Sequence, residues 1–192
     1  MSFGAAPGLI APKVERVPYR ATAAAVPYSE LRLPVSILLD NVRSMYNVGA
    51  FFRTADGAGV ERLLLSGITA RPPKNAITKT ALGAETRVPW KAVEDPLAAI
   101  AELRQAGYEV AAIETSTRAF DIFEWQPAFP VCVLFGHEVD GLSAPLLAAC
   151  DTHIRLPMLG LKHSLNVASA GAIVMYELLR KYRLLHRPAL ES

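Results

Sequence analysis

The chain has 192 residues, of which 52% are hydrophobic and 20% charged, and its formal net charge is +2. This composition is typical of one globular domain with a real core, and no apolar run approaches the ~18 residues of a membrane span. Because the first residues lack a basic segment followed by an apolar core, we expect no signal peptide, a cytoplasmic location and no membrane partner.

Residues 1–32 form a Pro-rich, basic N-terminal extension, which we separate from the domain at residues 33–192. Pro7, Pro12, Pro18 and Pro27 interrupt any helix in this stretch. One interpretation is a surface arm, and the other is an arm that touches a polyanionic substrate. The small positive charge of the whole chain permits a nucleic-acid partner without requiring one.

From Leu33 onwards, short apolar runs alternate with segments of helical period. The apolar runs predict buried strands at 35–39, 60–65, 86–90, 108–113, 131–135 and 153–156. Helices are predicted at 48–58, 77–82, from Asp95-Pro96 to Gly107, from the Ser143 cap to 150, and from about 164 to 185. Strands of this kind, alternating with helices, predict an α/β fold with a mostly parallel sheet and helices on both faces.

Two cysteines, Cys132 and Cys150, have no metal or redox spacing, so we expect reduced thiols in the core and no metal. The first predicted strand lacks a Gly-x-Gly-x-x-Gly turn. The chain also has no phosphate loop and no Gly-x-Ser-x-Gly elbow. These absences remove the main support for dinucleotide, ATPase and hydrolase functions.

Three Gly-containing segments with polar side chains remain as candidates: 47–55, 135–142 and 156–170. Ligands of parallel sheets bind outside the carboxyl ends of the strands, so convergence of these segments at one edge would form a site. Gly136 allows close approach of a ligand, and the helix expected from Ser164 offers free amide donors. Thr115 is a fourth candidate at the same edge, and Glu114 is a weaker one.

Each polar candidate also has a purely structural interpretation. Asn47 and Ser164 are common helix caps, and Glu138 fits a solvated loop carboxylate. Arg53 lies on a largely apolar helix, where its guanidinium needs a partner. That partner is a surface acid in one interpretation and a phosphate, which matches the guanidinium fork best, in the other.

At these residues the chain resembles the SpoU branch of the SPOUT superfamily of RNA ribose methyltransferases, over roughly residues 33–183. Three motifs carry the resemblance, in the family's order and on matching elements. They are Asn47-x-Gly49 through Arg53-Thr54-Ala55 to Gly59; Phe135-Gly136-x-Glu138-x-x-Gly141-Leu142; and Ile154 to Leu156, Pro157-Met158, Gly160 and Ser164-Leu165-Asn166-Val167.

The resemblance implies a C-terminal trefoil knot that carries the cofactor site, and a homodimer to which the final helix contributes. It implies S-adenosylmethionine as cofactor, S-adenosylhomocysteine as product, and methylation of a ribose 2′-hydroxyl in RNA. Many relatives that modify rRNA carry an extra N-terminal RNA-binding domain, for which thirty-odd residues are too few. We therefore expect tRNA as the substrate, with rRNA as the alternative.

The resemblance and the placement of residues at strand ends together give two candidate sets. The catalytic set is Arg53, Asn47, Glu138, Ser164 and Asn166, and the cofactor-binding set is Thr115, Gly136, Gly141, Leu156, Met158, Gly160 and Leu165. The family's description of Arg53 as a base conflicts with a guanidinium pKa above ~12. We expect it to fix a phosphate and to stabilise a developing alkoxide.

Two functions from other classes stay open: an RNA-binding module without catalysis, and an α/β enzyme acting on a small metabolite. The apolar side chains of the final helix, Ile173, Val174, Leu178 and Leu179, fit a dimer interface and an intramolecular core equally well. The basic residues near the C-terminus, from Arg180 to Arg187, suit RNA contact or a solvated helix end.

Overall fold

The structure, a computed structural model, describes residues 32–186. The predicted N-terminal arm and Arg187 lie outside the described residues. Seven strands form one sheet in the order β3-β2-β1-β6-β4-β7-β5, and every neighbouring pair is parallel. Their bounds are β1 Leu33–Asp40, β2 Val60–Ser66, β3 Trp90–Val93, β4 Glu109–Ile113, β5 Phe120–Asp121, β6 Val131–Phe135 and β7 Thr152–Arg155.

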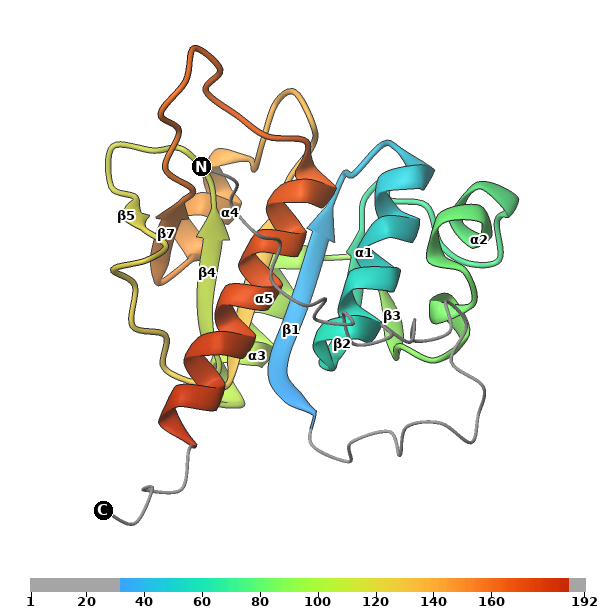
Figure 1. The fold of residues 1–192 in the computed structure, drawn as a ribbon, viewed down its shortest axis with the longest axis horizontal. Helices are drawn as coiled ribbons and strands as arrows, with labels where there is room; N and C mark the ends of the chain where they lie inside the picture. Colours follow the sequence, from blue (N-terminus) through green and yellow to red (C-terminus); the bar gives the residue numbers. More distant parts are fainter. Residues whose placement is uncertain (1–31, 187–192) are drawn as a thin grey trace, which may run out of the picture. The chain divides into compact units, whose positions relative to one another are not determined.

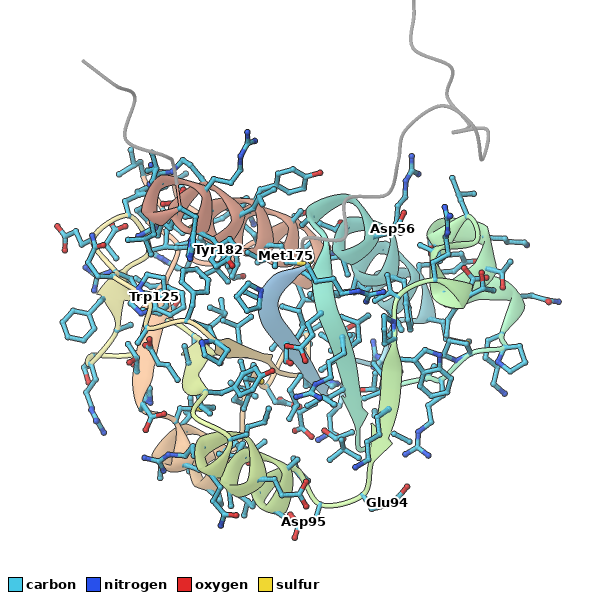
Figure 2. The ribbon with its side chains drawn as sticks, turned by 90° about the horizontal axis from the view of Figure 1, so that it is seen from below. Asp56, Glu94, Asp95, Trp125, Met175 and Tyr182 are labelled. Atoms are coloured by element: carbon cyan, nitrogen blue, oxygen red, sulfur yellow. The ribbon has the colours of Figure 1, made fainter. Side chains whose placement is uncertain are left out.

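Helices cover both faces of this sheet, as the alternation of strands and helices predicts (Figure 1). They are α1 Met45–Ala58, α2 Asn75–Ala81, α3 Pro96–Gln105, α4 Ala144–Ala149 and α5 Val167–Leu185, with a short 3₁₀ turn at Ala84–Thr86. Figure 2 shows α1 and α5 on one face of the sheet and α3 and α4 on the other. Met175, labelled there, projects from α5 towards the sheet and is fully buried.

The core has two parts, one on each face of the sheet. Under α1 and α5 it contains Phe51, Phe52 and Met175, and the ring of Phe51 meets Phe135 of β6 edge to face at 5.0 Å. Under α3 and α4 it contains Ile100, Leu146 and both cysteines, among other residues. Cys132 and Cys150 are free and buried, as predicted, and burial raises the pKa of each thiol.

Two strand predictions need correction. The strand expected at 86–90 is wrong except at Trp90, because Thr86 belongs to the 3₁₀ turn and β3 begins only at Trp90. There the Thr86 hydroxyl donates to the Gly83 carbonyl, and such local bonds compete with a strand ladder. The two-residue strand β5 was not predicted, since it is too short to show any periodicity.

Strand β7 lies between β4 and β5, which are consecutive in the sequence. Ile154 of β7 pairs with Ile113 on one side and with Phe120 on the other. The connection between β4 and β5, residues 114–119, therefore passes across the chain of β7. Among residues 32–186, no helix combines the length and the apolar character needed to cross a bilayer.

Candidate functional site

A pocket opens at the carboxyl ends of β4, β6 and β7, where the sequence places its candidate segments. The loop before α5 and the first turns of that helix complete its wall. Its lining is mixed, with apolar side chains beside polar ones and exposed backbone. The residues that line it are Ile113, Glu114, Thr115, Phe135, Gly136, His137, Glu138, Val139, Gly141, Ile154, Arg155, Leu156, Met158, His163, Ser164, Leu165, Val167 and Ala170.

Six of the seven predicted cofactor-binding residues therefore line this pocket: Thr115, Gly136, Gly141, Leu156, Met158 and Leu165. The seventh, Gly160, does not line the pocket, and a Cβ atom added to it would have no neighbour within 4 Å. Gly136 is buried, and a Cβ atom there would lie 2.3 Å from the carbonyl carbon of Gly141. The absence of a side chain at Gly136 thus lets the loop after β6 fold back on itself.

The carboxylate of Glu138 binds the start of α1 from across the pocket's edge. Its Oε2 accepts from the backbone N–H of Arg43 at 2.9 Å, and its Oε1 accepts from the N–H of Ser44 at 2.9 Å. Oε1 also accepts from the side-chain amide of Asn47 at 2.9 Å. Partial burial raises the pKa of Glu138, but these hydrogen bonds outweigh it and lower the pKa to about 2.

Asn166 extends this arrangement to the third motif. Its Nδ2 donates to Oδ1 of Asn47 at 3.1 Å, and its Oδ1 accepts from the N–H groups of Ala168 and Ser169. A continuous side-chain path, Asn166–Asn47–Glu138, therefore joins the three candidate segments. We refer to these three residues as the amide–carboxylate path.

Two predicted helix caps lie elsewhere. Helix α1 begins earlier than expected, with Ser44 as N-cap, its Oγ accepting from the N–H of Asn47 at 3.4 Å. Asn47 thus belongs to the first turn, so its side chain is available to Glu138 and Asn166. Helix α5 begins later than expected, with Asn166 as N-cap, which leaves Ser164 exposed in the preceding loop and lining the pocket.

Arg53 differs from its prediction in one respect. It lies on α1, but its side chain is exposed rather than held among apolar neighbours, so burial does not force a partner on it. It does not line the pocket, and the hydrogen bonds of Glu138 go to the chain around Ser44 and to Asn47. The structure thus brings Asn47, Glu138 and Asn166 into contact, while Arg53 lies further along the same helix.

Glu114 is more involved than its weak ranking in the sequence indicates. It follows β4 directly, and its Oε1 accepts from the N–H of Thr115 at 3.0 Å while its Oε2 accepts from the N–H of Leu142 at 3.2 Å. A Cβ atom on Gly141, whose φ is 68°, would lie 2.2 Å from Oε2. The carboxylate therefore fixes the loop after β6 to the strand beside it.

Three further polar side chains line the pocket and were not predicted: His137, Arg155 and His163. Nδ1 of His137 lies 3.3 Å from the N–H of Val139 and 3.1 Å from a carboxylate oxygen of Asp140. The first contact needs Nδ1 as an acceptor and the second needs it as a donor, so the tautomer of the ring decides between them. Among residues 32–186, no three His, Cys, Asp or Glu side chains are grouped to hold a metal ion.

Comparison with known proteins adds to this geometry. A model of the SpoU rRNA Methylase family matches residues 34–176. Over 149 residues the chain is 32% identical to a protein of Staphylococcus haemolyticus ascribed to the TrmH family of tRNA/rRNA methyltransferases, an alignment that covers 78% of this chain and 59% of that relative. The chain thus spans about three fifths of the length of such curated relatives.

Solved structures agree with the sequence match. A TrmH/SpoU tRNA modifying enzyme of A. aeolicus superimposes with a TM-score of 0.74 at 27% identity, covering 84% of this chain and 83% of that one. AviRb, a SpoU methyltransferase of Streptomyces viridochromogenes solved with S-adenosylmethionine, gives a TM-score of 0.72 at 27% identity and covers 82% and 61%. A structure that addresses 2-OH methylation at position 34 of tRNA gives 0.67 at 27% identity, covering 80% and 97%.

Proposed function

Because the chain belongs to the SpoU rRNA Methylase family, we propose that it transfers a methyl group from S-adenosylmethionine to a ribose 2′-hydroxyl of RNA. The family consists of RNA methyltransferases, which gives the reaction class. The observation that carries the proposal for this chain is the amide–carboxylate path. It joins all three motif segments beside a pocket whose lining suits the cofactor.

The pocket's lining fits S-adenosylmethionine. Ile113, Leu156 and Leu165 offer apolar surface for a purine ring, and Glu114 and Thr115 offer polar groups for ribose hydroxyls. The low pKa of Glu138 keeps its carboxylate ionised, which favours a positively charged ligand nearby. When bound, the cofactor supplies a methyl group on a positively charged sulfur.

Positioning is the role that we assign to the amide–carboxylate path. With a pKa of about 2, the Glu138 carboxylate is a poor general base at neutral pH. Its three hydrogen bonds instead hold the first turn of α1, and Asn47 with it, against the pocket. Asn47 and Asn166 then orient the ribose, and Ser164, which lines the pocket, contributes a further hydrogen bond there.

Arg53 is the residue to which we assign contact with the RNA. Its exposed guanidinium on α1 can bind a phosphate and stabilise negative charge as the 2′-hydroxyl loses its proton. Since a guanidinium does not give up its proton in proteins, we assign the acceptance of that proton to water or to the RNA phosphate.

We propose tRNA as the substrate, with rRNA as the alternative. A structure that addresses 2-OH methylation of tRNA matches this chain over 97% of that structure's length, which supports tRNA. An RNA-binding protein without catalysis remains the alternative function, against which the presence of Asn47, Glu138 and Asn166 in one path argues.

Four further parts of the proposal follow from the same membership. We propose that the crossing of residues 114–119 over β7 forms a trefoil knot, that residues 33–192 form the methyltransferase domain after the extension, and that the protein works in the cytoplasm. We also propose a homodimer through α5, where Ile173 and Tyr176 are 41% and 52% exposed. Val174 and Leu178, by contrast, belong to the core.

The test is transfer of labelled methyl from S-adenosylmethionine to unmodified tRNA and rRNA, followed by mass spectrometry of the nucleosides. Wild-type protein is expected to give a 2′-O-methyl nucleoside, and Arg53→Ala to lose it while keeping its cofactor affinity. Arg104→Ala, on α3 at the opposite face, is the matched control and is expected to retain activity. A base-methylated nucleoside would refute the 2′-O assignment, and absence of cofactor binding would refute the methyltransferase function.

A further inference from the structure

The segment Arg43–Tyr46 lies beside Glu138, which lines the pocket, and its backbone is held from several sides. Its N–H groups at Arg43 and Ser44 donate to Glu138, and the N–H of Val42 just before it donates to Oγ1 of Thr69 at 3.0 Å. At the other end, the carbonyl of Tyr46 accepts from Oγ1 of Thr80 on α2 at 3.1 Å. The path of this segment is therefore fixed by the protein itself.

Tyr46 presents its side chain to solvent on this fixed backbone. It is 56% exposed, whereas Phe51 and Phe52 of the same helix are fully buried. Its neighbour Asn47 belongs to the amide–carboxylate path, so the ring lies one residue from the site. The exposed ring does not contribute to the core, and its position next to Asn47 makes it available to a ligand of this site.

Arg53 lies on the same side of α1 as Tyr46. Seven residues are close to two helical turns, which puts the two side chains on one face and about 10 Å apart along the helix axis. Both are exposed. An aromatic ring and a guanidinium on one rigid face is the combination with which proteins bind unpaired nucleotides, the ring stacking on a base and the cation binding a phosphate.

We propose that Tyr46 is a stacking platform for an unpaired RNA base next to the methylated nucleotide. The inference rests on the proposed function for the identity of the nucleic acid, and it names the form of RNA that the site takes: a single-stranded segment. Stacking is available only to a base that has left its duplex, and the same unpairing exposes the neighbouring 2′-hydroxyl to the pocket. The fixed backbone of Arg43–Tyr46 lowers the ordering cost of such an encounter.

The experiment uses full-length protein and ten-nucleotide oligoadenylate and oligouridylate, each with one 2-aminopurine. Binding is followed by fluorescence anisotropy and stacking by quenching of the 2-aminopurine. Wild-type protein and Tyr46→Phe are expected to bind and quench alike. Tyr46→Ala is expected to raise the Kd roughly tenfold and to lose the quenching, with cofactor affinity unchanged. Phe123→Ala, which removes a ring that is 60% exposed but lies in the turn after β5, is the control and is expected to behave as wild type.

Several outcomes would overturn the inference. The first is a Tyr46→Ala protein with unchanged RNA affinity and unchanged quenching. The second is a Tyr46→Ala protein that changes its oligomeric state but not its RNA affinity, because the ring would then lie between two copies of the chain. The proposed function fails separately: a wild-type protein that binds these oligonucleotides through Tyr46 but transfers no methyl group to any RNA would support stacking and refute the methyltransferase. Methyl transfer that is unaffected by Tyr46→Ala would support the methyltransferase and refute stacking.

Discussion

The side-chain amide of Asn166 donates to the side-chain oxygen of Asn47 at 3.1 Å, although 119 positions separate the two residues. The orientation of both amides is fixed by their other partners. Glu138 is a pure acceptor, so Asn47 must turn its nitrogen towards Glu138 and its oxygen towards Asn166. Asn166 must turn its oxygen towards the N–H groups of Ala168 and Ser169, which leaves its nitrogen for Asn47.

The first prediction separates the two roles of Asn166. Asn166→Asp keeps an oxygen for the N–H groups at the start of α5 but replaces the donor facing Asn47 with an acceptor. We therefore expect the unfolding midpoint to stay close to wild type while methyl transfer falls by at least tenfold. Asn166→Ala is expected to lose activity and, with the cap, about 1 kcal/mol of stability. An Asp variant with full activity would contradict the positioning role.

The second prediction concerns pH. Partial burial raises the pKa of Glu138, but the hydrogen bonds from Ser44, Arg43 and Asn47 lower it to about 2, against 4.5 for the unperturbed group. The unfolded chain therefore binds the proton more readily, so this carboxylate stabilises the fold above pH 4.5 and loses that contribution as the pH falls towards 2. We expect the urea midpoint of Glu138→Gln to fall less than that of wild type over this interval.

The control for this titration is Glu94→Gln. Glu94 pairs with Arg71 at 3.3 Å, but its side chain is 87% exposed, so the variant is expected to follow the wild-type pH dependence. If Glu138→Gln and wild type lost stability in parallel, the hydrogen bonds at the start of α1 would not couple protonation to folding.

The third prediction concerns Lys181, which the sequence places in a solvated basic tail and the structure does not. It is 6% exposed, and its Nζ donates to the carbonyls of Ile122 at 2.8 Å and of Trp125. Lys181→Met would leave these carbonyls without their donor, so we expect a loss of about 2–4 kcal/mol in chemical denaturation. Arg180→Ala, which removes a 57% exposed side chain paired with Glu177, is expected to cost less stability than Lys181→Met.

Most strands and helices follow from the sequence because their cores are near-continuous apolar runs bounded by clear caps. Asp95 accepts from the N–H groups of Leu97 and Ala98, and Gly59 ends α1 with a φ of 71°, as predicted. The helix starts at Ser44 and Asn166 were harder to predict from the sequence, since each has another polar residue within three positions that can cap equally well. A contact from a distant segment decides between them in each case.

The sequence predicted which segments form the site, but not which hydrogen bonds join their side chains. The rule that ligands bind at the carboxyl ends of parallel strands places the three segments together. It cannot tell that Glu138 binds the backbone at Arg43, because that pairing depends on the path of a loop. The same holds for the insertion of β7 between β4 and β5, which no local pattern in the chain records.

The fourth prediction tests whether Glu114 is the reason for a glycine in the second motif. Gly141 has a φ of 68°, where a side chain is strained, and its Cβ atom would also lie 2.2 Å from Oε2 of Glu114. We expect Gly141→Ala to cost about 2–3 kcal/mol, part from the backbone and part from the clash. In a Glu114→Ala background the clash is absent, so the cost of the same change should fall to about 1 kcal/mol. Gly160→Ala, with no atom within 4 Å of the added Cβ, should cost less than about 0.5 kcal/mol. Equal costs of Gly141→Ala in both backgrounds, measured as a double-mutant cycle in urea, would show that backbone conformation alone requires the glycine.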